Sequence, residues 1–138
     1  MKSLFIDTNI VLDLLAKREP FYDDAAKLFT LADKQKIRLS VSALTFANTN
    51  YILLQSVKPD QAKLILRKLK LIVDVISLDE KIVGLSLNDN DFKDFEDALQ
   101  HFSALENGAD AIITRNLKDF QKAKLPIMTA GQFLKSIE

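Results

Sequence analysis

The spacing of hydrophobic and polar residues changes repeatedly along the chain, and these changes predict the order of its secondary-structure elements. Short apolar runs, several of them rich in branched side chains, predict buried strands at five places, because branched side chains favour an extended backbone. The predicted strands are Lys2–Ile6, Ile37–Val41, Leu71–Leu78, Ala111–Thr114 and Pro126–Met128.

Between these runs, apolar residues recur every three to four positions, which is the spacing of one helix face. Residues that favour a helix N-terminus precede several of these segments, and Thr129 with Gln132 resembles a capping box. The predicted helices are Thr8–Lys17, a segment from Pro20 towards Lys34, Ser42–Gln55, a segment opening at Pro59, Asp79–Leu87, Asp94–Asn107 with Gly108 as C-cap, and Ala130–Ile137, with a helical turn at Asn116–Phe120.

Strands that alternate with helices predict an α/β fold with a mostly parallel sheet of about five strands and helices on both faces. A length of 138 residues predicts one domain spanning residues 1–138. In such sheets the ligand site lies beyond the carboxyl ends of the strands. This rule selects Asp7, Ser42, Asp79 and the segment 114–116 as candidate site residues.

Composition narrows the chemistry that this site could perform. The chain has no Cys and a single His, which excludes disulfides, thiol catalysis and zinc sites built on Cys or several His. A metal would therefore be held by oxygen ligands, which favours Mg²⁺, Mn²⁺ or Ca²⁺. No apolar stretch approaches the length of a membrane span, and no signal peptide is recognisable, so we expect a cytoplasmic protein without membrane contact.

The formal net charge is zero, but charges are unevenly distributed. Residues 58–70 carry five basic side chains, residues 79–97 carry seven acidic ones, and residues 115–124 carry four basic ones. Solvated helix faces explain such runs as well as a nucleic-acid contact does. Lys63–Lys70, Arg115 and Lys118 are candidate phosphate contacts under the second interpretation.

Acidic residues provide the candidate chemistry. Asp7 ends the first strand, where it could either cap the next helix or take part in a site. Asp94, Asp97 and His101 fall on one arc of a helix, at the border of its apolar stripe. An acidic first turn that complements the helix dipole explains Asp94 and Asp97 equally well. For His101 we favour a position at the rim of the core over a role as general base.

Four segments together resemble the PIN domain family, the fold of VapC-type ribonuclease toxins. They occur in the family's order and cover nearly the whole chain. These segments are Phe5-Ile6-Asp7-Thr8-Asn9, Ser42–Asn48 with Tyr51-Ile52-Leu53, Asp97–Ala104 with Gly108-Ala109-Asp110, and Ile113-Thr114-Arg115-Asn116 with Asp119-Phe120.

The resemblance implies a three-layer sandwich and a metal-dependent endoribonuclease, the toxin of a type II toxin–antitoxin pair. It implies Mg²⁺ or Mn²⁺ held by Asp7 and Asp97, with Asn116 in the fourth acidic position, where the family has Asp or Asn, and Thr114 and Asp119 in support. RNA is the implied substrate, an antitoxin protein the implied partner and a homodimer the implied assembly.

The chain departs from the family at Asn48, where the second motif normally carries Glu. An amide offers a neutral oxygen in place of a charged one, which weakens metal binding and removes a proton acceptor. We expect Asp94, one helical turn before Asp97, to supply the missing charge.

Other classes fit less well. A phosphatase of the haloacid-dehalogenase type would need a second Asp where Asn9 stands, a receiver domain would need a Lys after the fifth strand, and nucleotide-binding folds would need glycine-rich loops. A PIN module with a weak or inactive site that binds RNA or a protein partner remains the alternative, and Asn48 is its main support.

Overall fold

The computed structural model describes residues 1–138 and contains one sheet of five parallel strands. The spatial order is β3-β2-β1-β4-β5, and every neighbouring pair is parallel. The strands are β1 (Ser3–Ile6), β2 (Arg38–Ser42), β3 (Val73–Ile76), β4 (Ala111–Ile113) and β5 (Ile127–Met128). The predicted α/β class and the five strands are confirmed.

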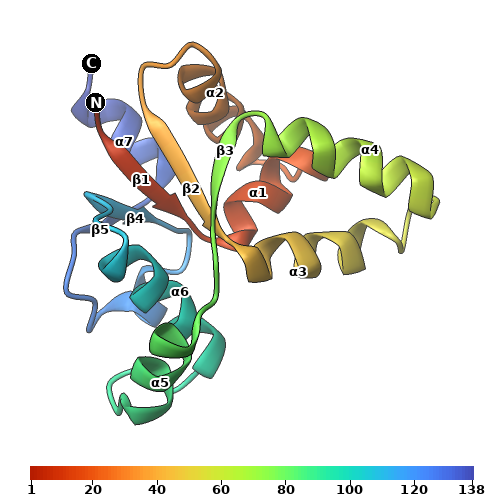
Figure 1. The fold of residues 1–138 in the computed structure, drawn as a ribbon. Helices are drawn as coiled ribbons and strands as arrows, with labels where there is room; N and C mark the ends of the chain where they lie inside the picture. Colours follow the sequence, from red (N-terminus) through yellow and green to blue (C-terminus); the bar gives the residue numbers. More distant parts are fainter.

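Six α-helices and one 3₁₀ turn connect these strands, and a seventh α-helix follows β5, in the predicted order (Figure 1). They are α1 (Thr8–Leu15), α2 (Tyr22–Asp33), α3 (Ala43–Leu53), α4 (Pro59–Lys70), α5 (Glu80–Asn88), α6 (Phe95–Glu106), η1 (Leu117–Phe120) and α7 (Ala130–Ser136). The side chains of Ser42, Asp79 and Thr129 cap the helices that follow them, as the sequence predicts.

The strand predicted over Leu71–Leu78 is shorter in the structure, where β3 covers only Val73–Ile76. Its partner is β2, and the pairing runs from Leu39 opposite Val73 to Ser42 opposite Ile76. Because α3 begins directly after Ser42, β2 offers no further backbone to pair with. The end of β2 therefore limits β3 on that side, whereas at its start the chain is still leaving α4, since the N–H of Ile72 donates to the carbonyl of Leu69.

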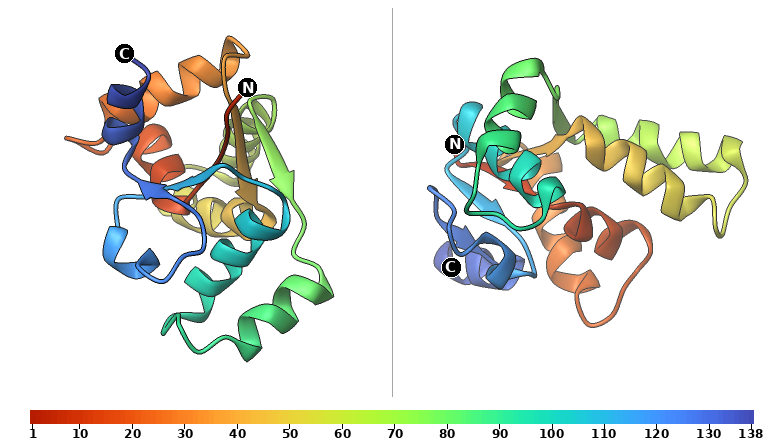
Figure 2. Two further views of the ribbon diagram at one scale, coloured as in Figure 1. Left: turned by 90° about the vertical axis from the view of Figure 1, so that its left-hand side faces the viewer. Right: turned by 90° about the horizontal axis from the view of Figure 1, so that it is seen from below.

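Two apolar clusters cover the two faces of the sheet and produce the three layers. On one face, β-strand side chains pack against α1, α2, α4 and α7, with Leu28 and Val11 among the fully buried residues. On the other face, Phe5 and Ile112 pack against α5, α6 and η1. Figure 2 shows the sheet between these two groups of helices.

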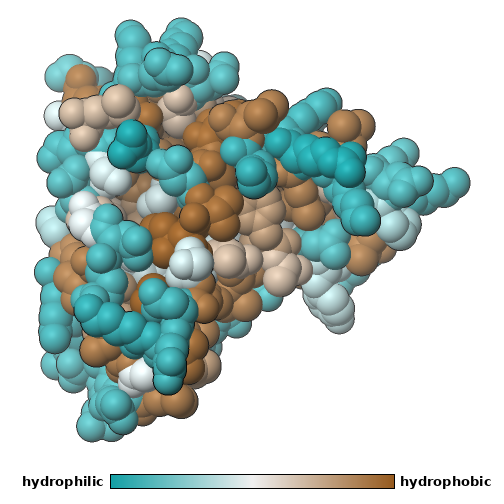
Figure 3. All heavy atoms as spheres, viewed as in Figure 1, coloured by the Kyte–Doolittle hydropathy of each residue, from teal (hydrophilic) through white to brown (hydrophobic).

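Helices α3 and α4 form an arm that extends away from the sheet (Figures 1 and 2). Apolar side chains stay exposed on the arm and beside it, including Tyr51, Leu64 and Leu71, of which Leu71 is 87% exposed. Figure 3 shows apolar surface over β3 and the adjoining part of the arm. None of the helices is both long and apolar enough to cross a membrane.

The sheet changes direction beside its central strand. The chain runs from β1 outward to β2 and β3, then returns to place β4 on the other side of β1. Ligands of open parallel sheets bind where the strand order reverses, beyond the carboxyl ends of the strands. In this chain that point lies between Asp7, which follows β1, and Thr114, which follows β4.

Candidate active site

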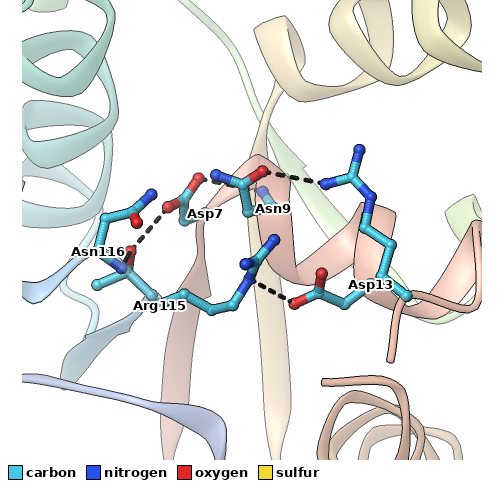
Figure 4. A network of polar contacts seen from close by, with 7 residues as sticks. Asp7, Asn9, Asp13, Arg115 and Asn116 are labelled. Atoms are coloured by element: carbon cyan, nitrogen blue, oxygen red, sulfur yellow. Dashed lines mark hydrogen bonds and ion pairs between the residues drawn. The ribbon is translucent and has the colours of Figure 1, made fainter. Parts of the chain in front are cut away.

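Asp7 is held at the carboxyl edge of the sheet by backbone and side-chain contacts. Its N–H donates to the carbonyl of Ile113, which fixes the end of β1 against β4. The Thr114 hydroxyl donates to Asp7 Oδ2 at 2.7 Å, and the N–H of Asn9 donates to Asp7 Oδ1 at 3.2 Å (Figure 4). Asp7 therefore caps α1, and it also lines a polar pocket, so capping does not exclude a part in a site.

Burial raises the pKa of Asp7, because only 5% of the residue is exposed and the charged form loses water. The hydrogen bond from Thr114 and that from Asn9 oppose this rise by stabilising the carboxylate. A buried carboxylate with directed donors is a rigid group. It is suited to bind a cation that enters from the one side left open to the pocket.

The carboxylates selected from the sequence line one polar pocket of about 310 Å³. It contains no apolar residue and no basic one. The pocket is lined by Asp7, Thr8, Asn9, Asp94, Glu96, Asp97, Gln100, Asn116 and Asp119. The fold thus brings together residues that follow β1 and β4, residues at the start of α6, and Asp119 of η1, which lies 112 positions after Asp7.

Asp97 is the half-buried acid of the first turn of α6. Its pKa is raised to about 7, first by burial and then by repulsion from the carboxylates of Asp94 and Asp119. Clustered carboxylates that repel one another gain stability when a cation neutralises them. Asp97 is therefore an acid whose ionisation depends on what occupies the pocket.

Asp94 lies just before α6, and its side chain folds back towards the backbone N–H groups of the first turn of that helix. Its Oδ1 accepts from the N–H groups of Glu96, at 2.8 Å, and Asp97, at 3.3 Å. Asp94 is thus the N-cap of α6, which the dipole interpretation anticipates in part. It still lines the pocket and contributes charge there.

Glu96 is an acid of this pocket that the sequence interpretation missed. The side-chain amide of Asn48, on α3, donates to Glu96 Oε1. This bond joins α3 to α6 at the position where the resemblance placed a Glu on α3. The arc of Asp94, Asp97 and His101 excluded Glu96, and no sequence signal links it to Asn48, because the two residues are 48 positions apart.

His101 lies in the core, not at its rim, and is only 1% exposed. Its Nε2 accepts from the N–H of Lys124, and its ring packs against Phe92 and Phe102 with centroids 4.7 Å apart in both pairs. Burial lowers the pKa of His101. The helical arc was wrong for this residue, because Asp97 faces the pocket while His101 faces the apolar cluster around Phe120.

Arg115 also turns inward. Its Nε lies 3.0 Å from Oδ2 of Asp13, which is 1% exposed, and its guanidinium stacks on Phe21 at 4.0 Å from the ring centroid (Figure 4). Burial raises the pKa of Asp13, and the charge of Arg115 opposes that rise. Since Arg115 lies between Thr114 and Asn116, this ion pair anchors the loop that carries both. Arg115 is thus engaged by Asp13 and Phe21, although 27% of its side chain stays exposed, so it is less available as a phosphate contact than an unpaired lysine.

The donor set fits a small divalent cation. All the candidate ligands are oxygens, which Mg²⁺ and Mn²⁺ prefer. No three Asp, Glu or His side chains converge into a complete metal cage. Mg²⁺ does not need one, because it keeps several waters and binds through one or two carboxylates.

Comparisons with known proteins identify the family of this chain. The family model of the PIN domain matches residues 3–118. Ribonuclease VapC1 of Aquifex aeolicus (strain VF5) is 27% identical over 138 residues, covering 96% of this chain and 93% of that protein.

Solved structures share the fold at lower identity. A toxin–antitoxin complex from Klebsiella pneumoniae contains a chain with TM-score 0.70 and 22% identity, covering 92% of this chain and 97% of that one. VapC20 of Mycobacterium tuberculosis, described as a Sarcin-Ricin loop cleaving toxin, has TM-score 0.66 and 16% identity, covering 88% and 95%. With a family model that spans most of its length and with the strand order and acidic edge described above, this chain belongs to the PIN domain family.

Proposed function

We propose that this protein is a metal-dependent endoribonuclease that hydrolyses RNA phosphodiester bonds. One observation carries the proposal: five carboxylates, with amide and hydroxyl oxygens between them, line one polar pocket where the strand order reverses. The relative from Aquifex aeolicus carries the name of a ribonuclease, which supports this reaction class. In this proposal residues 1–138 act as one cytoplasmic domain.

Asp7 and Asp97 are the principal groups that would hold Mg²⁺ or Mn²⁺, with Asn116 and Asp119 in support. The bound ion would act as a Lewis acid towards the phosphodiester and neutralise charge that develops during its hydrolysis. Thr114 keeps Asp7 oriented through its 2.7 Å hydrogen bond, and its hydroxyl also accepts from the N–H of Asn116 at 3.0 Å. The Thr114 hydroxyl thus helps to position both Asp7 and Asn116.

Asn48 and Glu96 replace a single Glu in this proposal. Asn48 supplies no charge, but its amide holds the Glu96 carboxylate at the wall of the pocket. Glu96 therefore supplies negative charge and a proton acceptor where the resemblance expects them. Asp94 adds charge to the same wall, so the site keeps its acidic character despite Asn48.

We also propose that the enzyme works as the toxin of a toxin–antitoxin pair. The structural neighbours include chains solved in such complexes. Exposed apolar residues on the α3–α4 arm are the kind of surface that a protein partner or a second copy of the chain covers. Size-exclusion chromatography with light scattering would test the homodimer.

The decisive experiment measures cleavage of labelled single-stranded and structured RNA with Mg²⁺ or Mn²⁺ and with EDTA. We expect cleavage only with the metal, and its loss in Asp7→Asn. Thr114→Val should reduce cleavage strongly and Thr114→Ser should retain it, because only Ser keeps the hydroxyl. Asp60→Asn, on the exposed first turn of α4, is the matched control. Metal-independent cleavage, or cleavage that persists in Asp7→Asn, would refute the proposal.

The alternative function, an inactive PIN module that binds RNA or a protein, rested on Asn48. The contact between Asn48 and Glu96 weakens that argument, because the pocket retains five carboxylates. Absence of cleavage by a folded wild-type protein, together with RNA binding, would favour the module.

A further inference from the structure

A second groove adjoins the acidic pocket on the side of η1. Its volume is about 390 Å³, and it lies between the loop that precedes α6 and the segment around η1. It is lined by Asp91, Phe92, Lys93, Asp94, Asp97, Lys118, Asp119, Gln121 and Lys122. Three of these residues, Asp94, Asp97 and Asp119, also line the acidic pocket, so the two hollows meet along one carboxylate edge.

Three exposed lysines line this groove and distinguish it from the acidic pocket. Lys93 comes from the loop before α6, Lys118 from η1, and Lys122 from the segment just after η1. None of the three forms an ion pair with a carboxylate of the chain, although four aspartates line the same groove. Their ammonium groups are therefore free to bind an external anion.

We propose that this lysine groove, formed by Lys93, Lys118 and Lys122, binds phosphates of single-stranded RNA next to the scissile one. This inference rests on the proposed ribonuclease function, and it adds where the RNA strand would lie beside the acidic pocket. An RNA strand that crosses the acidic pocket meets no basic side chain among the residues that line it. Its next phosphates can meet cationic side chains where the pocket opens into the groove.

Competing basic groups fit this role less well. Arg115 is occupied by Asp13 and Phe21. Lys63, Arg67 and Lys70 line a different hollow on the arm, together with Phe46 and Leu66, and that hollow shares no residue with the acidic pocket. The groove beside η1 is the lysine-lined hollow that continues from the carboxylates.

Lysine side chains are suited to contacting the phosphates of an RNA strand that passes along the site. Its ammonium group is a flexible point charge that contacts phosphate without reading the base. Each phosphate contact on a single strand contributes about 0.7 to the slope of log affinity against log salt. Removing two lysines should therefore lower that slope by about 1.4.

The test compares RNA binding by two matched double variants of the full chain. Lys118→Ala with Lys122→Ala removes two charges from the groove, and Lys27→Ala with Lys135→Ala removes two from exposed positions on α2 and α7. Fluorescence anisotropy follows binding of a labelled oligouridylate of about twelve nucleotides. The titrations contain Ca²⁺ and roughly 50 to 200 mM salt, and a gel confirms that the RNA stays intact.

We expect the groove variant to bind about tenfold more weakly at low salt, a few-fold per lysine, and the control to stay within about twofold of the wild type. Equal losses in both variants, an unchanged salt slope in the groove variant, or no binding by the wild type would each overturn the proposal.

Cleavage, measured separately with Mn²⁺, distinguishes the two hypotheses. If the wild type binds RNA through the groove but does not cleave it, the proposed function fails and the groove stands. If the wild type cleaves RNA and the groove variant binds as tightly as the control, the groove fails and the proposed function stands.

Discussion

Replacing Asp97 by Asn should stabilise the metal-free protein above neutral pH and abolish its cleavage of RNA. The carboxyl group of Asp97 is half-buried and faces the carboxylates of Asp94 and Asp119, which raises its pKa from 3.8 to about 7. Its ionisation therefore costs free energy in the folded state that it does not cost in the unfolded state. An amide of nearly the same shape removes that cost.

The sign of the pH dependence follows from the raised pKa. Below pH 3.8 Asp97 is neutral in both states and imposes no penalty. As pH rises towards 7, the unfolded chain releases this proton first, so folding stability is lost until the folded state releases it too. The advantage of Asp97→Asn over the wild type should therefore grow between acidic and mildly alkaline pH.

The magnitude has an upper bound. A pKa difference from 3.8 to about 7 corresponds to roughly 4 kcal/mol, at about 1.4 kcal/mol per pH unit. Solvent reaches part of the side chain and screens the repulsion, and the dipole of α6 favours a negative charge in its first turn. We therefore expect a gain of about 1–2 kcal/mol.

Urea unfolding in EDTA, at about pH 4.5 and about pH 8, measures this difference directly. Asp60→Asn, on the exposed arm, serves as the control and should show no such growth. The protonation of His101 affects the wild type and the variant alike, so it cancels from the comparison. Adding Mn²⁺ should stabilise the wild type more than Asp97→Asn, since a ligand that binds the folded state raises its stability. An advantage that is equal at both pH values would refute the argument from repulsion.

Three further predictions concern groups around the site. Arg115→Met should reduce the free energy of unfolding by about 2–3 kcal/mol in urea titrations at about pH 8, because it leaves the buried carboxylate of Asp13 without its cation; a loss below about 1 kcal/mol would contradict this. The contribution of His101 to stability should fall as pH drops below about 6.5, because burial lowers the pKa of His101 and only the unfolded chain takes up the proton easily; the free energy of unfolding of the wild type relative to His101→Phe, in which the carboxylates titrate alike, should therefore decrease between about pH 8 and about pH 4.5, and a constant difference would count against it. Glu96→Gln should weaken Mn²⁺ binding in calorimetry by about tenfold, and adding Asn48→Glu should restore part of it; wild-type affinity in Glu96→Gln would show that its charge is not used.

Local sequence signals anticipated the elements because each signal is complete within a few residues. Ser42, Asp79 and Thr129 cap their helices through side chains that reach backbone only two or three positions away. The prediction of Asp7 as a site residue used one further rule, that parallel strands end at a common edge. In the structure a hydrogen bond joins Asp7 to Thr114 across that edge, while the role of Asp7 in catalysis stays a prediction.

Side-chain direction was less predictable, because it depends on what packs against each element. The helical arc grouped Asp94, Asp97 and His101, yet only the two aspartates line the pocket, one of them as the helix cap, and His101 lies in the core. From the sequence alone, Arg115 is expected to be an exposed basic residue. The Asp13 carboxylate and the Phe21 ring, both supplied by other elements, draw it inward.

The sequence by itself determined the alternation of strands and helices, the family resemblance and the acidic residues available for chemistry, because periodicity, caps and motifs act over short distances. Only the tertiary structure decided which of those charges share a pocket. The contact of Asn48 with Glu96 and the meeting of the acidic pocket with the lysine groove join segments far apart in the chain. Such distances are set by how the layers pack, and packing depends on the whole core at once.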